Sequence, residues 1–180
     1  MLNQPALIMI NTLIGGCSGA MFTFVARKFL LRVDDPINTT DITTFCNGMI
    51  TGMISVCANA ESLSPTETII TGILASFTYH IIVLVFEKLK IDDPLEASQV
   101  HIGGGLVGLL SVGLFDQEVG YFHAAGPKQL SYQLIGALAI IVWSLIISLA
   151  FFKVMDRLGR LRISKTLELL GLDVQFEGII

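Results

Sequence analysis

A single histidine stands inside an apolar, glycine-rich stretch near the middle of the chain, where an imidazole can bind a small polar solute. Four glycines follow it closely, at Gly103, Gly104, Gly105 and Gly108. Residues four apart are neighbours on a helix surface, as His101 and Gly105 are. Gly104 and Gly108 share this spacing, which lets another backbone approach closely. An ionisable side chain in such a helix is a candidate functional residue; the alternative is a hydrogen bond to a neighbouring helix.

The surroundings of His101 predict the kind of solute that its ring would serve. Apolar neighbours disfavour a charged imidazole, so we expect the ring to be neutral. A neutral ring donates or accepts a hydrogen bond without a counter-ion, which suits a small neutral solute or one that releases a proton on entry. A hydrated cation would instead need carbonyl or carboxylate ligands.

The helix that carries His101 has a start signal of its own. Asp92, Asp93 and Pro94 precede it, and we expect Asp93 as the N-cap and Pro94 as the first helical residue. An acid there also suits the positive end of the helix dipole. Glu96 is expected at the cytoplasmic boundary, where it would contribute to the same cap; a gating role is the alternative. These residues would lie at the entrance of the His101 helix.

The composition is that of a membrane protein. Hydrophobic residues make up 53% of the chain and charged residues only 14%, against about a quarter in soluble domains. The net charge of −4 gives no basic surface for nucleic acid. Cys17, Cys46 and Cys57 are scattered, which indicates neither a disulfide framework nor a zinc site. We expect no metal, no cofactor and no enzymatic activity.

Five stretches free of charged residues are long enough, at about 20 residues, to cross a bilayer as helices. They are residues 2–26, 42–60, 68–86, 97–115 and 129–152. We therefore predict an all-α, polytopic membrane bundle over residues 1–159, followed by a tail over 160–180. Ser64, Pro65 and Glu67 form a capping sequence before the third stretch. Glycine pairs four apart, at Gly15 and Gly19 and at Gly48 and Gly52, predict close helix packing.

The basic residues predict the orientation. Ten of the 11 fall in the first loop, the third loop or the tail, and Lys128 alone lies on the opposite side. The N-terminus is therefore expected outside and the C-terminus in the cytoplasm. The remaining histidines are expected to have structural roles: His80 in an interhelical or interfacial hydrogen bond, and His123 as a residue of the outer loop.

A second class of function is an intramembrane serine protease. Residues 16–19 read GCSG, which resembles the motif of rhomboid-type proteases, with Ser18 as nucleophile and His101 as base. However, the two helices are expected to run antiparallel with two others between them, whereas the rhomboid pattern needs parallel spans separated by one. A four-residue motif in a helix rich in glycine and serine is also weak.

Nearly the whole chain resembles the C-terminal half of the Amt ammonium transporters, within the Amt/Rh/Mep group. The motifs occur in order and at the family's spacing. They are Asn11-Thr12, Cys46-Asn47-Gly48, Lys90-Ile91-Asp92-Asp93-Pro94, Val100-His101-Ile102-Gly103-Gly104, Arg160-Leu161-Arg162-Ile163 and Gly171-Leu172-Asp173.

This resemblance implies a transport function and a role for His101. It would be the second of the family's two pore histidines, in a protein that carries ammonium or ammonia through a multi-pass fold, with the plasma membrane as the expected location. The resemblance also implies a homotrimer in which each full-length subunit has its own channel and the tail couples the subunits.

The resemblance is incomplete, because family members have eleven spans and this chain matches the last five. The first pore histidine and the outer ammonium site have no counterpart here. We therefore expect a partial or truncated ammonium transporter that does not conduct alone. The alternative is a non-conducting interaction subunit that associates with full-length ammonium transporters; the protease is the third hypothesis.

Overall fold

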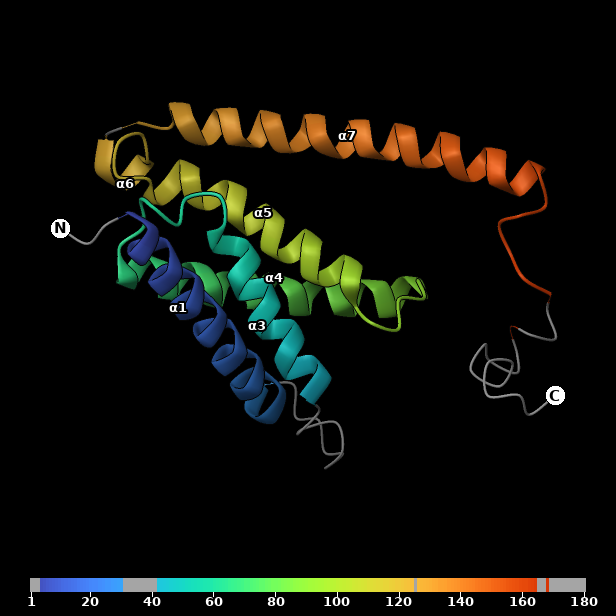
Figure 1. The fold of residues 1–180 in the computed structure, drawn as a ribbon, viewed down its shortest axis with the longest axis horizontal. Coiled ribbons are helices and arrows are strands. Elements are labelled where there is room, and N and C mark those ends of the chain that lie inside the picture. Colours follow the sequence, from blue (N-terminus) through green and yellow to red (C-terminus); the bar gives the residue numbers. More distant parts are fainter. Residues whose placement is uncertain (1–3, 31–41, 125, 165–167, 169–180) are drawn as a thin grey trace. The chain divides into compact units, whose positions relative to one another are not determined.

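The computed structural model describes residues 4–30, 42–124, 126–164 and 168, and every regular element in these residues is helical (Figure 1). The helices are α1 (Gln4–Val25), the π-helical turn η1 (Ala26–Leu30), α3 (Ile42–Val56), α4 (Pro65–Leu89), α5 (Ala97–Phe115), α6 (Tyr121–Ala124) and α7 (Lys128–Arg157). The predicted tail lies mostly outside the described residues, as does most of the first loop.

The chain divides into two units, Met1–Ala137 and Leu138–Ile180. The first unit contains α1, α3, α4, α5 and α6, and α1 packs against both α3 and α4. α5 also packs against both α3 and α4. The second unit contains most of α7 and the segment that follows it.

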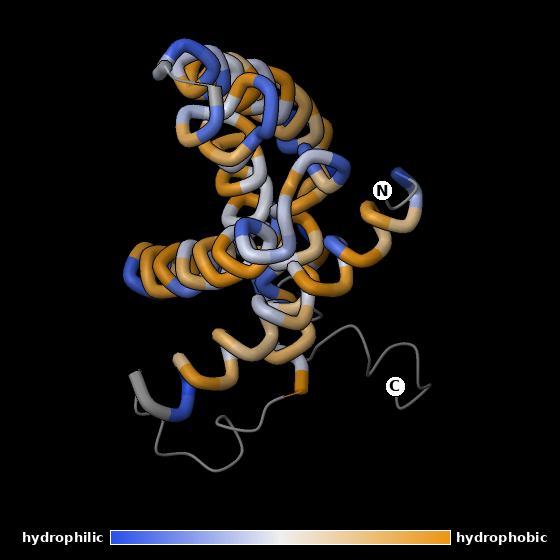
Figure 2. The backbone as a smooth tube through the Cα atoms, turned by 90° about the vertical axis from the view of Figure 1, so that its left-hand side faces the viewer, coloured by the Kyte–Doolittle hydropathy of each residue, from blue (hydrophilic) through white to orange (hydrophobic). Residues whose placement is uncertain are grey.

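Within the described part of the chain, four helical segments are long and apolar enough to cross a membrane. They are Gln4–Lys28, Pro65–Leu89, Ala97–Phe115 and Lys128–Arg157. These correspond to four of the five predicted spans, and Figure 2 shows their predominantly apolar character. The predicted span at 42–60 corresponds to the shorter α3, which has 15 residues.

The predicted end of that span is wrong because the chain turns after Val56. Asn11 on α1 donates from Nδ2 to the backbone carbonyls of Ala60 and Leu63, at 2.8 Å each. These two bonds hold the 57–63 segment as a turn against α1. The sequence of residues 42–60 could not predict this turn, because the turn depends on Asn11, which lies 49 residues before Ala60.

The interior of the first unit holds many polar side chains. Many of its fully buried side chains are hydroxyls or amides, such as Asn11, Thr51 and Ser76. Large apolar side chains lie outside instead; Met9 and Phe77, for example, are 67% and 51% exposed. Lipid solvates such side chains and small polar residues favour helix contact within a bilayer, so this distribution fits a membrane bundle.

Glycine makes the contact between α1 and α3 possible. A Cβ atom added at Gly52 would lie 2.1 Å from the carbonyl oxygen of Gly15, and one at Gly19 would lie 2.5 Å from that of Gly48. Both distances are far below van der Waals contact, so any side chain would push the backbones apart. The spacing of the two glycine pairs predicts this close packing, and the structure confirms it.

α4 begins with a complete capping box. The Ser64 hydroxyl accepts a hydrogen bond from the Glu67 N–H, the Glu67 carboxylate accepts one from the Ser64 N–H at 2.8 Å, and Pro65 opens the helix. The predicted cap is therefore confirmed. At the other end of α4, Lys90 takes a left-handed backbone conformation with φ 55°, which ends the helix.

Candidate functional site on α5

The predicted N-cap position, Asp93, is wrong, because Glu96 is the N-cap residue of α5; the carboxylate of Asp93 nevertheless caps the helix from three residues before Glu96. It accepts hydrogen bonds from the N–H groups of Ser98, at 2.8 Å, and Ala97, at 3.3 Å. The bond from Ser98 lowers the pKa of the Asp93 carboxyl below its ordinary value, so the group stays ionised at the positive helix end. The sequence predicts Pro94 as the first helical residue, and this prediction is wrong. Pro94 lies in a turn, and the helix begins at Ala97. Asp92 precedes that turn as an exposed residue.

Three of the glycines that follow His101 lie against α3 or α4. A Cβ atom at Gly104 would lie 2.8 Å from the Thr51 carbonyl oxygen, and one at Gly108 would lie 2.9 Å from the Ser55 carbonyl oxygen, both on α3. Gly103 lies against α4, where a Cβ atom would be 3.0 Å from the backbone nitrogen of Tyr79. Side chains at these positions would therefore separate α5 from the bundle.

His101 and Gly105 lie on a face of α5 that the other described residues of the first unit leave open. The His101 side chain is exposed, and it forms no hydrogen bond or ion pair with any described residue of that unit. A Cβ atom at Gly105 would meet no atom within 4 Å. Next to His101, Ile102 is 48% exposed. The structure thus places an imidazole beside a notch in the helix surface, with room for a solute or another helix.

A polar cluster joins the start of α5 to the other helices. The Glu96 carboxylate accepts hydrogen bonds from the hydroxyl of Tyr79 on α4 and from Nδ2 of Asn47 on α3, the latter at 3.2 Å. A guanidinium nitrogen of Arg27 on η1 lies 3.9 Å from the same carboxylate. We name these four residues the Glu96 cluster.

Glu96 differs from its predicted role. Its side chain does not cap α5, and its backbone takes a left-handed conformation with φ 55°, which is strained for a residue other than glycine. This backbone turns the carboxylate toward Tyr79 and Asn47. The cluster thereby fixes the beginning of the helix that carries His101. Sequence reasoning missed it because its members come from four separate elements with no common spacing.

His80 also differs from expectation. It is 6% exposed, and its Nε2 atom has no hydrogen-bond partner in the described part of the protein. Its ring instead packs beside two aromatic rings, with centroids 4.9 Å away for Tyr79 and 6.5 Å away for Phe22. The expected interhelical hydrogen bond is therefore not formed among these residues.

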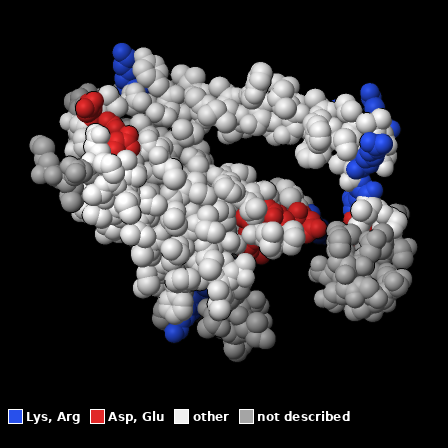
Figure 3. All heavy atoms as spheres, in the orientation of Figure 1, with Lys and Arg blue, Asp and Glu red and all other residues white. Residues whose placement is uncertain are grey.

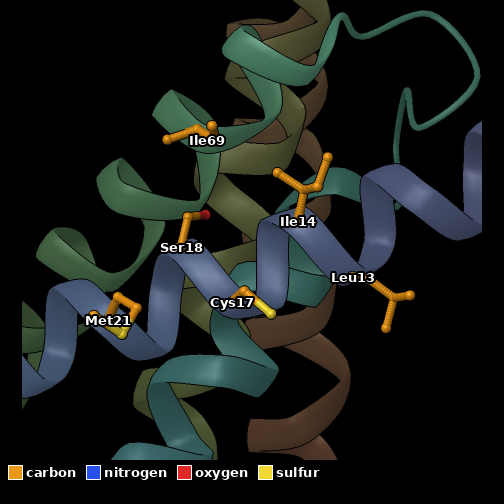
Figure 4. Close-up of a pocket in the computed structure, with 6 residues that line it drawn as sticks. All are labelled: Leu13, Ile14, Cys17, Ser18, Met21 and Ile69. Atoms are coloured by element: carbon orange, nitrogen blue, oxygen red, sulfur yellow. The ribbon is translucent and has the colours of Figure 1, made fainter.

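Ser18 packs between helices. Its hydroxyl donates to the Gly15 carbonyl at 3.0 Å and occupies the space beside Gly72 on α4, where a Cβ atom would lie 2.2 Å from it. Figure 4 shows Ser18 in a shallow apolar groove between α1 and α4. His101 does not line this groove. Nothing in this arrangement supports a Ser18–His101 catalytic pair.

Comparison with known proteins decides the family. The sequence model of the Ammonium Transporter Family matches residues 2–178. The chain belongs to the ammonium transporter family. It is 34% identical over 188 aligned residues to the putative ammonium transporter 1 of Caenorhabditis elegans. That alignment covers 96% of this chain and 34% of the worm protein. Putative ammonium transporter 1 member 5 of Arabidopsis thaliana is 32% identical, with 94% of this chain and 36% of that protein covered.

Solved structures of similar proteins support the same fold. A Mep2 mutant, delta442, from Candida albicans has a TM-score of 0.77 and 25% identity, covering 89% of this chain and 42% of that one. A protein described as a sensor Amt protein has a TM-score of 0.81 at 24% identity, covering 97% and 42%. The predicted fold class, a membrane helix bundle matching part of the ammonium transporter fold, is therefore confirmed. The chain spans about a third of the length of the first curated relatives that it matches.

Among the described residues, no group of three or more His, Cys, Asp and Glu side chains is arranged to hold a metal ion. The three cysteines are free and exposed.

Proposed function

We propose that the chain forms one wall of a transmembrane path for ammonium or ammonia, with the imidazole of His101 lining that path. The observation that carries the proposal is the open face of α5, where an exposed imidazole lies beside the notch at Gly105. Membership of the ammonium transporter family supplies the class of solute.

The chemistry of His101 suits this solute. A neutral imidazole exchanges one hydrogen bond with ammonia and needs no counter-ion, whereas a desolvated ammonium ion would need a compensating carboxylate or carbonyl. Among the described residues, no carboxylate contacts His101, so the ring would stabilise ammonia rather than the cation. An ammonium ion would therefore transfer its proton to water outside the path, and the neutral ammonia would then reach His101.

The open face implies that a further wall completes the path. An imidazole turned toward lipid would lack a hydrogen-bond partner, which is costly in hydrocarbon. We propose that another transporter segment covers His101 and Gly105, either from a longer polypeptide or from a partner subunit in a homotrimer. We further propose a plasma-membrane protein with its N-terminus outside and its C-terminus in the cytoplasm, in line with the distribution of basic residues.

Flux measurements test the proposal. The purified chain is reconstituted in liposomes that contain a pH dye, and internal pH is followed after an ammonium pulse. Flux above that of empty vesicles, lost in His101→Ala and kept in Ile102→Ala, would support a path formed by this chain. Ile102 is the matched control because it is an exposed neighbour on the same helix.

Absence of flux from the chain alone would reject autonomous transport and lead to a second arm. The chain is then co-reconstituted with a full-length ammonium transporter. Co-purification with a flux that changes between wild type and His101→Ala would place His101 in a shared path. Association with identical flux for both variants would favour the second candidate, a non-conducting interaction subunit, for which the open face of α5 is also suited.

A further inference from the structure

The end of α7 and the residues after it combine basic side chains with exposed apolar ones. We call residues 153–163 the basic–apolar segment. Its basic members are Lys153, Arg157, Arg160 and Arg162. Its exposed large apolar members are Val154, Leu158, Leu161 and Ile163, which are 42% to 62% exposed. Figure 3 shows the Lys and Arg atoms gathered at this end of α7.

The backbone turns within the segment. Gly159 has φ 65°, its N–H donates to the Asp156 carbonyl at 2.9 Å, and the Arg160 N–H donates to the Met155 carbonyl at 3.0 Å. This pair of bonds is the usual glycine-based helix stop. Residues 160–163 therefore leave the helix, so that both basic and apolar side chains extend from a short exposed strip.

The basic side chains have few partners within the protein. Lys153, Arg157 and Arg160 form no ion pair with any described residue, and Arg162, which contacts Glu168, remains 71% exposed. Asp156 is the one acidic residue within the segment's sequence, so the segment carries a net charge of +3. The contact with Glu168 offsets one of these charges, and a net positive charge remains at the end of a helix that is apolar enough to span a bilayer.

We propose that the basic–apolar segment binds the phosphate groups of anionic phospholipids at the membrane surface where α7 ends. Arginine presents a planar fork of N–H donors that matches phosphate, and clusters of basic residues beside a membrane helix are attracted to anionic lipid. The interleaved Leu158, Leu161 and Ile163 enter the boundary with the acyl chains. A soluble anion would pair only with the basic side chains. A phospholipid would pair with them through its phosphate and would also contact the apolar side chains through its acyl chains.

Lipid titration tests the proposal. The purified chain in neutral detergent is titrated with dioleoylphosphatidylglycerol or dioleoylphosphatidylcholine, and bound lipid is counted by native mass spectrometry. We expect preference for phosphatidylglycerol. Since one basic residue near an anionic surface contributes about fivefold in affinity, Arg157→Gln/Arg160→Gln should weaken that binding about 25-fold.

The matched control removes the same charge elsewhere. Lys88→Gln/Lys90→Gln neutralises two exposed basic residues at the end of α4. An equal loss in this variant would show attraction to net charge alone and would overturn the proposal. Equal binding of both lipids, or displacement of phosphatidylglycerol by millimolar inorganic phosphate, would also overturn it.

A depth measurement separates a membrane-bound segment from one that binds lipid only in detergent. Trp143 is the single tryptophan of the chain, so Trp143→Phe/Leu161→Trp places one reporter in the segment. In phosphatidylglycerol bilayers with brominated acyl chains, we expect quenched emission. Adding Arg157→Gln/Arg160→Gln should relieve the quenching. Unquenched emission without those changes would mean that the segment does not reach the interface.

Discussion

The carboxylate of Glu67 contacts the imidazole of His123, 56 residues further along the chain. The same carboxylate caps α4 and accepts a hydrogen bond from Nε2 of Gln117 at 3.1 Å. The Gln117 N–H donates to the Ser62 hydroxyl at 2.9 Å. One carboxylate thus holds together the start of α4 and the connection between α5 and α6.

Replacing His123 should loosen this connection with little effect on the bundle. The contact is partly exposed, so His123→Ala should lower the free energy of unfolding by less than about 1 kcal/mol. Hydrogen exchange of residues 116–123 should rise more than that of α5. A double-mutant cycle with Glu67→Gln, read by thermal unfolding in detergent, measures the coupling. Additive effects of the two changes would show that the contact contributes no stability.

The close packing of α1 and α3 predicts a large effect of one added methyl group. Gly52→Ala would place its Cβ atom 2.1 Å from the Gly15 carbonyl oxygen, so the helices must move apart. We expect a destabilisation of about 1–3 kcal/mol. Gly136→Ala is the control, because a Cβ atom there meets nothing within 4 Å. Similar melting temperatures for the two variants would contradict the close contact.

The Glu96 cluster predicts a cost for removing one hydroxyl. Tyr79 is fully buried and its hydroxyl donates to the Glu96 carboxylate, so Tyr79→Phe should leave a polar group without its partner and cost about 1–3 kcal/mol of stability. Tyr132→Phe removes a hydroxyl from a residue that is 56% exposed, and it should have little effect. Chemical denaturation in mixed micelles compares the two. Equal stabilities would mean that Tyr79 does not hold Glu96.

The pH dependence of stability should include two aspartates outside the spans. The Ser98 N–H lowers the pKa of Asp93. Burial alone would raise the pKa of Asp116, but the N–H groups of Glu118 and Val119 outweigh it and lower the value. A carboxyl with a lowered folded pKa stabilises the fold above its unfolded pKa, about 3.9, and that stability is lost as pH falls through the folded value.

Melting temperatures between pH 6 and pH 3 measure this contribution. The decrease below about pH 4 should be smaller in Asp93→Asn and Asp116→Asn than in the wild type. Asp92→Asn serves as the control, because Asp92 is an exposed residue whose carboxylate accepts no hydrogen bond from the described residues. An identical acid-side slope in all four proteins would refute the assignment.

Stability and transport should separate at His101. Since its side chain is exposed and unpaired among the described residues, His101→Ala should change the free energy of unfolding by no more than about 0.5 kcal/mol. Thermal unfolding of this variant beside Val100→Ala, a change in the buried core, checks the contrast. A large loss of stability in His101→Ala would indicate a structural role for the ring.

The lengths of the stretches without charged residues predict most of the helical fold. Charged side chains are costly in lipid, so they occur mainly in the loops between spans. It could not predict where α3 ends, since that end depends on Asn11 reaching across from α1. The order of the family's motifs along the chain indicates His101 as a candidate pore residue, and the four-residue spacing predicts that Gly105 lies beside it on the helix. The Glu96 cluster was beyond reach, because a left-handed Glu96 and its partners on three other elements leave no pattern along the chain.

The short α3 is less than a bilayer in length. At about 1.5 Å per residue, its 15 residues cover roughly 22 Å, less than the roughly 30 Å of a bilayer's hydrocarbon. α3 alone therefore cannot cross the hydrocarbon as one straight helix. The two hydrogen bonds from Asn11 satisfy carbonyl groups of the turn that follows it, so this irregular stretch of backbone keeps polar partners from the protein itself.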